Sequence, residues 1–399
     1  MAFLSLLRSI RQCFKNRKMG PPRFGESSRG SYAAAYRKRK GGGRARGVRS
    51  RVREVDDGDG SEESEFDVRM LFSVLERLQL VLGLIHLDRF PDSLKSLVQT
   101  VAEIPAMALE LCGNTASFDK LTHLCSRVLT EVLSSEHGDQ ATTAAEVLKS
   151  LSPLILLAKS EARTFALGFM MNRMMGMAKE FDGVKKAIVN LPRYLLQKAP
   201  EKSEPRALAV ESVMEIVKTM EFEEQIGFVK YVVKMTQGKS HFRLLAVDLF
   251  PLLIMSLRDP LGVNTGNEVK NSWGLNCLEA LIQRCSDATA GIRARALTNL
   301  AQIVGFLSTD DRNQVMLKEG MGFGSSSHQK LEGGVNDLLR KRCMDEKAAV
   351  RKAALLLITK LTGLLGGEFV GDLLKTMGMA CSDPLVSIRK AAISALSEV

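Results

Sequence analysis

Aromatic residues are scarce in this chain, which has one tryptophan, Trp273, and a total aromatic content of 6%. This scarcity favours helices packed through Leu, Ala, Val and Met over a β-sandwich, because strands are enriched in aromatic and β-branched residues. No segment shows the strict alternation of polar and apolar residues that is typical of a strand. No uninterrupted apolar run reaches the roughly 18–20 residues needed to cross a bilayer, so we expect no membrane span.

Motifs of catalysis and metal binding are also missing. The seven cysteines include no C-x-x-C pair, and their odd number indicates reduced thiols. His123 and Cys125 are close in sequence, but on a helix they point to different faces. The run 238–240, Gly-Lys-Ser, resembles the end of a phosphate-binding loop but lacks its earlier glycine and a preceding strand. No Ser-His-Asp, Cys-His or paired-carboxylate set stands out, so we predict no enzyme activity, cofactor or small-molecule substrate.

Positive charge is concentrated at the N-terminus. The net charge is +11, but residues 1–53 hold sixteen Lys or Arg and one acid, Glu26, which gives +15. The remaining residues hold 40 basic and 44 acidic side chains, a balance of −4. The basic character therefore belongs to the tail, and any affinity for nucleic acid inferred from charge is assigned mainly to it.

Residues 1–65 are predicted to form a disordered basic tail that ends in an acidic linker, because their composition buries too little apolar area to fold. The candidate nuclear-import signal or phosphate-binding arm consists of Arg37, Lys38, Arg39, Lys40, Arg44, Arg46, Arg49, Arg51 and Arg53. The first eighteen residues are amphipathic, with Phe3, Leu7, Ile10 and Phe14 on one face and Arg8, Arg11, Lys15 and Lys18 on another. That pattern suits an organelle transit peptide, a membrane-surface helix, a partner-docking helix or an unstructured leader.

An internal repeat organises the second half of the chain. Counting from Asp345, the residues at offsets 5, 6, 9, 10 and 13 are Val350, Arg351, Ala354, Leu355 and Ile358. The same offsets from Asp383 give Ile388, Arg389, Ala392, Ile393 and Leu396, and from Asp287 they give Ile292, Arg293, Ala296, Leu297 and Leu300. A weaker copy starts at Gln237 with Phe242, Arg243, Ala246, Val247 and Phe250. Offsets 5, 9, 10 and 13 lie on one stripe of a helix, so we expect that stripe to be buried against neighbouring units.

This repeat predicts an all-α solenoid of HEAT or armadillo type. We expect degenerate helical repeats over 66–236 and clear repeats over 237–399, interrupted by two surface loops at 259–274 and about 308–334. The recurring acids and arginines, Asp287, Arg293, Asp345, Arg351, Asp383 and Arg389, are interpreted as a structural ladder of ion pairs between neighbours rather than as acid–base pairs. A methionine cluster at 170–177 is interpreted mainly as core.

A family resemblance adds to this pattern. The runs LLRKRCMDEKAAVRKAALLLITKL at 338–361 and CSDPLVSIRKAAISALSEV at 381–399 resemble the D-type HEAT-repeat subunit of condensin. The runs at 191–217 and 241–257 are similar to its condensin II form, especially from plants. Family members are far longer, so we expect a fragment or a truncated gene product.

The resemblance implies a regulatory, non-ATPase subunit that binds a kleisin, approaches the SMC ATPase heads and contacts DNA or chromatin in the nucleus. Candidate phosphate contacts in the solenoid are Arg340, Lys341, Arg342, Lys347 and Lys352, and a solvated helix face is the plainer alternative. Two other classes of protein stay open. One is a nuclear-transport or phosphatase-scaffold solenoid, and the other is an organelle-targeted helical-repeat RNA binder.

Overall fold

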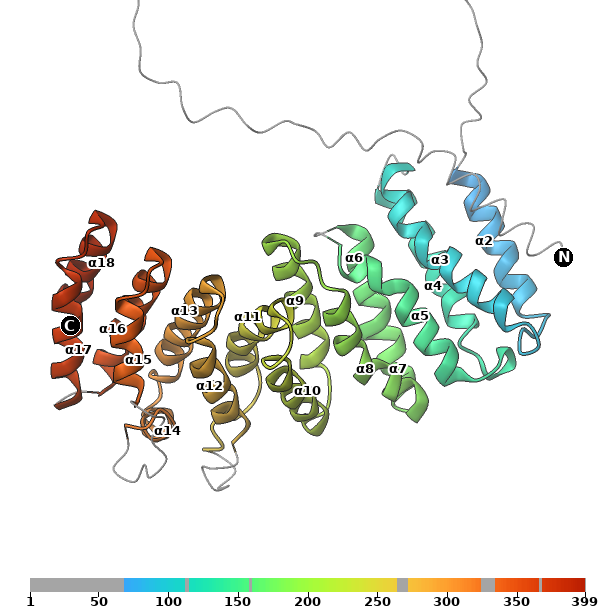
Figure 1. Ribbon diagram of the computed structural model, residues 1–399. Helices are drawn as coiled ribbons and strands as arrows, with labels where there is room; N and C mark the ends of the chain where they lie inside the picture. The colour runs from blue at the N-terminus through green and yellow to red at the C-terminus, as the bar shows by residue number, and fades with distance from the viewer. Residues whose placement is uncertain are drawn as a thin grey trace, which may run out of the picture. The chain divides into compact units, whose positions relative to one another are not determined.

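The computed structural model describes residues 68–111, 115–157, 160–263, 272–323, 334–365 and 368–398. Every regular element in these ranges is a helix (Figure 1), which confirms the predicted all-α class. None of the described helices combines the length and the apolarity that a bilayer crossing requires. The predicted basic tail and the candidate arm at residues 37–53 lie outside the described residues.

The chain divides into two compact units. The described part of the first unit holds α2 (Val68–Leu82), α3 (Pro91–Leu111) and α4 (Thr115–Glu131). On α2, the residues Leu71, Leu75, Leu78 and Leu82 recur at three- and four-residue spacing and are buried. Both α2 and α3 pack on α4. The unit is therefore a small helical cluster closed by one leucine stripe.

The second unit contains residues 86–89 and 132–398. Its elements are the 3-10 turn η1 (Ser135–His137), α5 (Gln140–Ile155), α6 (Glu161–Gly168), the π-helical segment η2 (Phe169–Met174), α7 (Met175–Ala178), α8 (Asp182–Lys198), α9 (Ser203–Lys218), α10 (Phe222–Met235), α11 (Ser240–Ser256), α12 (Trp273–Arg284), α13 (Ala290–Leu307), α14 (Asp311–Gly320), α15 (Gly334–Cys343), α16 (Ala348–Leu365), α17 (Glu368–Ala380) and α18 (Val386–Ser397).

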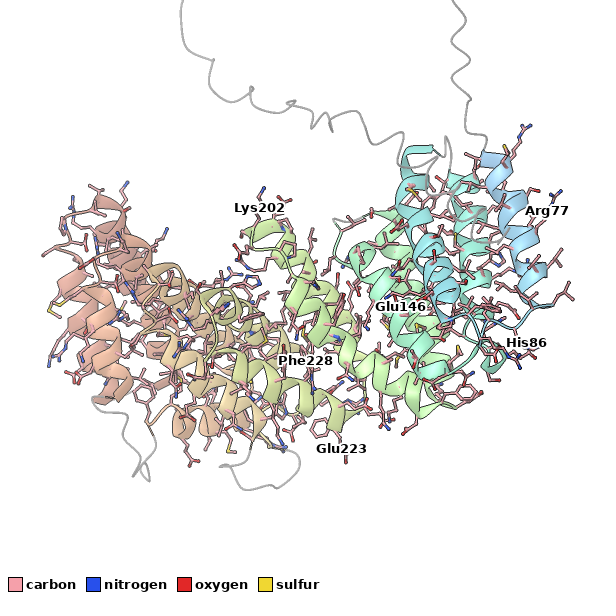
Figure 2. The ribbon with its side chains drawn as sticks, turned by 45° about the vertical axis from the view of Figure 1, so that its right-hand side comes forward. Arg77, His86, Glu146, Lys202, Glu223 and Phe228 are labelled. Carbon is pink, nitrogen blue, oxygen red and sulfur yellow. The ribbon has the colours of Figure 1, made fainter. Side chains whose placement is uncertain are left out.

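From α9 onward the helices form two rows. Helices α9, α11, α13, α16 and α18 pack each on the next, and α10 on α12 and α15 on α17 make a second row. The helices of each successive pair, α10 and α11, α12 and α13, α15 and α16, and α17 and α18, also pack on each other. Apolar side chains lie on the packed face of each helix and charged side chains on the outer face. On α10, for example, Phe228 is buried, whereas Glu223 is exposed (Figure 2). The predicted stack of two-helix repeats is confirmed over this part of the chain.

Small residues at the contacts of the first row let its helices approach closely. The alanines at offset 9, Ala246, Ala296, Ala354 and Ala392, are all fully buried. A larger side chain there would overpack the contact between neighbouring helices. The larger apolar residues at offsets 10 and 13 are buried too in three of the four copies. The exception is Ile393 of α18, which is 59% exposed because no described helix packs against that side of α18.

The second insertion contains a helix where the sequence was expected to form only a loop. Helix α14 occupies Asp311–Gly320, so that prediction is wrong. The backbone N–H of Arg312 donates to the carboxylate of Asp310 at 2.9 Å, which caps the helix. Leu317 and Met321 are buried, while most other residues of the segment are at least partly exposed. Two apolar anchors and one cap thus form a helix in a segment too polar to be recognised as one. The centre of the first insertion, 264–271, lies outside the described residues.

Two further features add detail to the expectations from the sequence. The methionine cluster is divided: Met170 and Met174 are fully buried, whereas Met171 and Met175 are half-buried and line a hollow. The boundary between the compact units lies near residue 131, well before the start of the clear repeats at 237. The repeat pattern can be recognised in the sequence from position 237 onward, whereas the packing of paired helices begins before that position.

Candidate functional site

An arginine–aspartate ladder runs along the first row of helices. Arg243 of α11 donates from Nε and Nη2 to both carboxylate oxygens of Asp287, at 2.8 and 3.1 Å. Arg293 of α13 makes the same two-bond contact with Asp345, with both distances 2.9 Å. Each arginine therefore pairs with the aspartate of the following repeat, and Arg293 does so although its own repeat contains Asp287. Paired bonds of this kind fix the relative orientation of the two groups as well as their distance.

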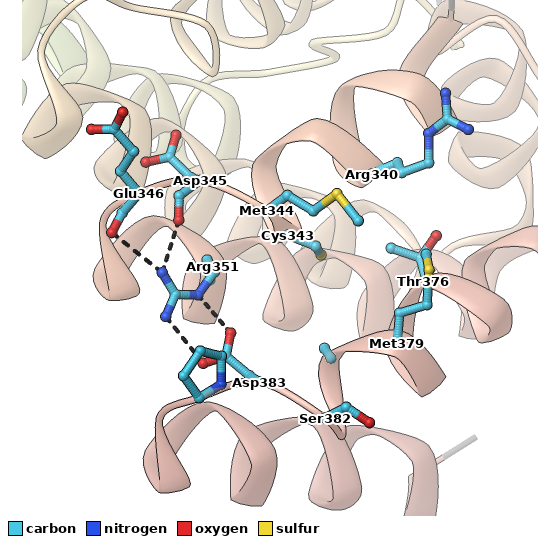
Figure 3. Close-up of a pocket in the computed structure, with 12 residues that line it drawn as sticks. Arg340, Cys343, Met344, Asp345, Glu346, Arg351, Thr376, Met379, Ser382 and Asp383 are labelled. Carbon is cyan, nitrogen blue, oxygen red and sulfur yellow. Dashed lines mark hydrogen bonds and ion pairs between the residues drawn. The ribbon is translucent and has the colours of Figure 1, made fainter.

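The next rung follows the same plan in a modified form. Arg351 of α16 donates from Nη2 to Asp383 at 3.1 Å, and its Nε lies 2.7 Å from the other oxygen of that carboxylate. Figure 3 shows this guanidinium between the carboxylate of Asp383 and the main-chain carbonyls of Asp345 and Glu346. Its Nη1 donates to those carbonyls at 2.8 and 3.3 Å. The arginine thus joins its own helix start to the next repeat.

The carbonyl contacts recur along the row. Nη1 of Arg293 donates to the carbonyls of Asp287 and Ala288 at 2.9 and 3.1 Å, and Nη1 of Arg389 donates to those of Asp383 and Pro384 at 2.7 and 3.0 Å. These acceptors lie five and six residues before each arginine. The arginine that pairs with the next repeat therefore also holds the loop that leads into its own helix.

Each aspartate also accepts a hydrogen bond from the residue that immediately precedes the following helix. The backbone N–H groups of Thr289, Lys347 and Leu385 donate to Asp287, Asp345 and Asp383 at 2.9, 3.1 and 2.8 Å. A carboxylate at this place satisfies a free N–H and is favoured by the positive end of the helix dipole. Each aspartate side chain thus stabilises the start of a helix and pairs with an arginine of the preceding repeat.

The electrostatics of the aspartates follow from these bonds. Burial favours the neutral form of Asp287, but hydrogen bonds from Arg243 and Thr289 outweigh it, so the pKa of this carboxyl lies below its ordinary value. The pKa of Asp345 is lowered in the same way, against burial, by Arg293 and Lys347. A second arginine adjoins each of them: Nη1 of Arg284 lies 3.1 Å from Asp287, and Nη1 of Arg342 lies 3.0 Å from Asp345.

Two earlier arginines occupy equivalent places that the sequence analysis missed. Arg206 of α9 donates to Asp248 of α11 at 3.0 Å and to the carbonyl of Glu201 at 2.6 Å. Arg295 of α13 reaches the same carboxylate at 2.6 Å, so Asp248 joins three helices of the row. In α6, Arg163 donates from Nε and Nη2 to Ser212 of α9 at 3.0 and 2.8 Å.

A signal for both arginines was present in the sequence. Counting from Pro200, the five offsets give Pro205, Arg206, Ala209, Val210 and Val213; counting from Leu157, they give Ala162, Arg163, Ala166, Leu167 and Met170. The units that follow these two arginines start at Pro200 and Gln237 instead of an aspartate. Arg163 and Arg206 bond instead to Ser212 and Asp248, in the middle of α9 and α11. A search by offsets alone, without requiring an acid, would have found them.

The predicted basic patch is divided by the structure. Arg342 is half-buried and belongs to the ladder through Asp345, and Arg340 lies 3.0 Å from Asp337 on its own helix. Lys341, Lys347 and Lys352 are exposed, and no ion pair joins them to other residues in the described ranges. These three lysines of the α15–α16 pair are thus the members of the patch available to a ligand.

A hollow of about 410 Å³ adjoins this part of the ladder. It lies between the α15–α16 and α17–α18 pairs, and its lining includes Arg340, Met344, Thr376, Met379 and Ser382 (Figure 3). Within the described ranges, no three His, Cys, Asp or Glu side chains gather in a way that could hold a metal ion. Burial raises the pKa of the Cys343 thiol, which also lines this hollow, to about 12. A thiol with so high a pKa carries almost no thiolate at neutral pH.

Comparison with known proteins identifies two curated relatives of this chain. No family model matches the chain. Over 400 aligned residues, the chain is 56% identical to the condensin-2 complex subunit CAP-D3 of Arabidopsis thaliana, an alignment that covers all of this chain and 30% of that protein. It is 23% identical over 323 residues to the condensin-2 complex subunit D3-L of Xenopus laevis, which covers 69% of this chain and 21% of that protein.

Two solved structures align with the fold. One is a designed armadillo repeat protein in complex with the peptide (KR)4, at 16% identity, with a TM-score of 0.33, covering 74% of this chain and 99% of that one. The other is a chain of the Pds5–Scc1 complex, at 11% identity, with a TM-score of 0.38, covering 83% of this chain and 61% of that one. Alignments at these scores add nothing to the description of the fold.

The chain spans less than a third of the length of either curated relative. The alignment with the plant protein nevertheless includes both compact units and every rung of the ladder, because it runs along the whole chain. The chain is therefore homologous, over its full length, to part of the condensin-2 complex subunit CAP-D3 of Arabidopsis thaliana.

Proposed function

We propose that this chain is part of a non-catalytic scaffold in a condensin II-type complex, where it binds a kleisin and DNA during mitotic chromosome condensation. The observation that carries the proposal is the 56% identity to a condensin-2 subunit along the whole chain. Approach to the SMC ATPase heads belongs to the same proposal. The corresponding location is the nucleus and the chromosome.

The ladder supplies the physical basis for a scaffold. A solenoid holds its partners on the sides of successive repeats, so the repeats must keep a fixed orientation relative to one another. Rungs such as Arg293–Asp345, with two bonds to a carboxylate that is almost fully buried, resist rotation of one helix pair against the next. We assign the ladder this structural role and no role in chemistry.

Contact with DNA is proposed for two groups of residues. Lys341 of α15, Lys347 of the turn that follows and Lys352 of α16 are exposed and are free to neutralise phosphates. The second group is the arm at residues 37–53, for which nuclear import is a further proposed use. Phosphate contacts of this kind give affinity without sequence preference.

The alternatives have less support. A transport or phosphatase scaffold agrees with the repeat architecture, but both curated relatives are named as condensin-2 subunits. The organelle-targeting alternative rests on the amphipathic first eighteen residues alone, and no comparison supports it. Neither alternative has an observation that favours it over condensin II.

Purification of partners tests the proposal. The full chain, tagged and expressed in plant cells, is expected to co-purify with two SMC ATPases and a kleisin. A second variant carries Arg293→Ala and Asp345→Ala, which together remove one rung of the ladder. This variant is expected to recover less kleisin than the original chain at equal expression. Recovery of transport factors or a phosphatase, without SMC proteins, would contradict the proposal.

DNA contact is tested separately through the salt dependence of binding. Lys341→Ala, Lys347→Ala and Lys352→Ala together are expected to weaken binding of the full chain to a 30-base-pair duplex. They should lower the slope of log K against log salt by roughly 0.9 for each phosphate that is no longer neutralised. The control removes equal charge at three other exposed lysines, Lys149, Lys218 and Lys234. Equal slopes for the two triple variants would exclude the α15–α16 patch, and loss of binding only on deleting residues 1–53 would assign DNA contact to the tail.

A further inference from the structure

A hollow of about 630 Å³ in the second unit lies between three segments: η2 with α7, the first half of α8, and the turn from α9 to α10. Its apolar lining includes the half-buried Met171 and Met175 and the buried Ile188 and Met220. Flexible methionine side chains adapt to the shape of a partner and are common on protein-binding surfaces. Every polar side chain of the lining is at least partly exposed. A small-molecule site places polar groups inside its pocket, so this hollow suits a peptide better.

A π-helical turn lies at the edge of this hollow. The backbone N–H of Met175 donates to the carbonyl of Met170, five residues before it. Met170 and Met174 are fully buried, whereas Met171 and Met175 line the hollow. Single π-helical turns within a helix are frequent at functional sites. The backbone irregularity and the exposed methionines thus occur at the same place.

Two exposed phenylalanines adjoin the same hollow. Phe181 and Phe222 are 38% and 49% exposed, and each is next in sequence to a lining residue, Asp182 and Glu221 respectively. Within the described residues 160–263, they are the large apolar side chains that are exposed. A single exposed apolar side chain is ordinary, but two beside an apolar hollow mark a surface of interaction.

The charged lining of the hollow is one cation short. It consists of Lys179, Glu180, Asp182, Lys185, Glu221 and Glu224. Nζ of Lys185 lies 2.9 Å from Glu221 and 3.2 Å from Glu224, so two carboxylates share one ammonium group. Asp182 pairs at 3.4 Å with Lys186, which is outside the lining, and the two remaining lining residues carry opposite charges. One negative charge is therefore left at the group that Lys185 joins.

We propose that this hollow binds a peptide segment of a partner subunit that carries a long apolar side chain and, within one helical turn of it, a Lys or Arg. The apolar side chain inserts against Met171 and Met175, and the cation pairs with Glu221. The side chain of Glu221 is 73% exposed and that of Glu224 is 20% exposed, so Glu221 is the more accessible acceptor. This inference rests on the proposed function, under which the segment belongs to the kleisin.

Binding of synthetic peptides tests the proposal. Overlapping peptides that cover the kleisin of the same species are titrated against the full chain by fluorescence anisotropy. Gly176 lines the hollow, and a Cβ there meets nothing within 4 Å, so Gly176→Phe has room to fill the hollow. The matched control is Gly363→Phe, at an equally open position of α16 away from the hollow. We expect a peptide with an apolar residue near Lys or Arg to bind at least tenfold more weakly to Gly176→Phe and unchanged to Gly363→Phe.

A second variant removes charge without changing the packing. Glu221→Gln keeps a hydrogen-bonding side chain at an exposed position. It should weaken binding of the same peptide about threefold. It should leave unchanged the binding of a peptide whose Lys or Arg is replaced by Gln. An equal effect on the two peptides would contradict the pairing with Glu221 and overturn the choice of partner.

Three other outcomes would overturn the proposal. One is that no peptide of the set binds, and another is that Gly176→Phe and Gly363→Phe bind the peptide equally. The third is a change from dimer to monomer in Gly176→Phe, measured by light scattering, which would assign the hollow to a second copy. Recovery of SMC proteins with the full chain depends on none of these results, so this proposal and the proposed function can fail separately.

Discussion

Removal of the carboxylate of Asp345 is the sharpest test of the ladder. The side chain is 4% exposed and accepts bonds from Arg293 at 2.9 Å twice, from Arg342 at 3.0 Å and from the backbone of Lys347 at 3.1 Å. Asp345→Ala leaves two largely buried guanidinium groups without their anion and the backbone N–H of Lys347 without its acceptor. Loss of one partner of a buried ion pair costs about 3–5 kcal/mol.

The matched control is Asp337→Ala. Asp337 pairs with Arg340 at 3.0 Å, but the two side chains are 42% and 58% exposed. An exposed pair contributes about 0–1 kcal/mol. The two variants remove the same chemical group from neighbouring sites, so they differ mainly in burial.

Urea denaturation followed by far-UV circular dichroism measures the difference in the free energy of unfolding. Hydrogen exchange should locate the loss of protection in α13 and α16, the helices that the Arg293–Asp345 rung joins. A double-mutant cycle with Arg293→Ala should give a coupling energy of about 1–3 kcal/mol, because the two groups are in contact. If Asp345→Ala costs less than about 1 kcal/mol, like Asp337→Ala, the rungs do not hold the repeats together.

Three further outcomes are expected. Gly274→Ala should destabilise the fold by about 1–3 kcal/mol in urea denaturation, because its Cβ would clash with the carbonyl oxygen of Pro260. Gly291→Ala, where a Cβ meets nothing within 4 Å, should be neutral or slightly stabilising. The free energy of unfolding should fall as the pH drops below about 4, because the pKa of Asp287 is lower in the folded state than in the unfolded state. The stabilisation from the charged Asp287 is complete above the unfolded pKa of about 3.9 and is lost as the pH falls through the folded pKa. Asp287→Asn should therefore reduce the slope of the free energy of unfolding against pH in this range, and an unchanged slope would refute the assignment. Cys285, whose pKa is raised by burial to about 12, should resist alkylation by iodoacetamide at pH 8 until urea is added, and rapid modification of the native chain, detected by mass spectrometry, would contradict its burial.

The repeat architecture could be predicted from the sequence because packing of the helices imposes a strict spacing. Residues such as Ala296 and Leu300 lie on one stripe, and a stripe of that period has one physical interpretation. The direction of the rungs could not be predicted. Nothing in the spacing of Arg293 tells whether it pairs with Asp287, six residues before it, or with Asp345, which is 52 residues later. That choice depends on which helices lie side by side.

Other features could not be predicted because their local signals are weak or ambiguous. The α14 segment is polar, and its helix depends on burial of Leu317 and Met321, which only the tertiary contacts supply. Arg342 looked like a member of a basic surface patch, yet it lies beside Asp345. A charged residue in a run of charges has the same appearance in the sequence whether it contacts solvent or a buried carboxylate.

The forward pairing of each arginine has a consequence for how such a chain can change in length. The pairs Arg243–Asp287, Arg293–Asp345 and Arg351–Asp383 have similar geometry, although 44, 52 and 32 residues separate their members. Insertions in the segments that connect the helices therefore leave the geometry of the arginine–aspartate pairs unchanged. Deletion of one complete unit would leave the preceding guanidinium facing the carboxylate of the next, so no orphaned charge would result. Gain or loss of whole units, rather than of parts of them, is the change that such a chain tolerates most easily.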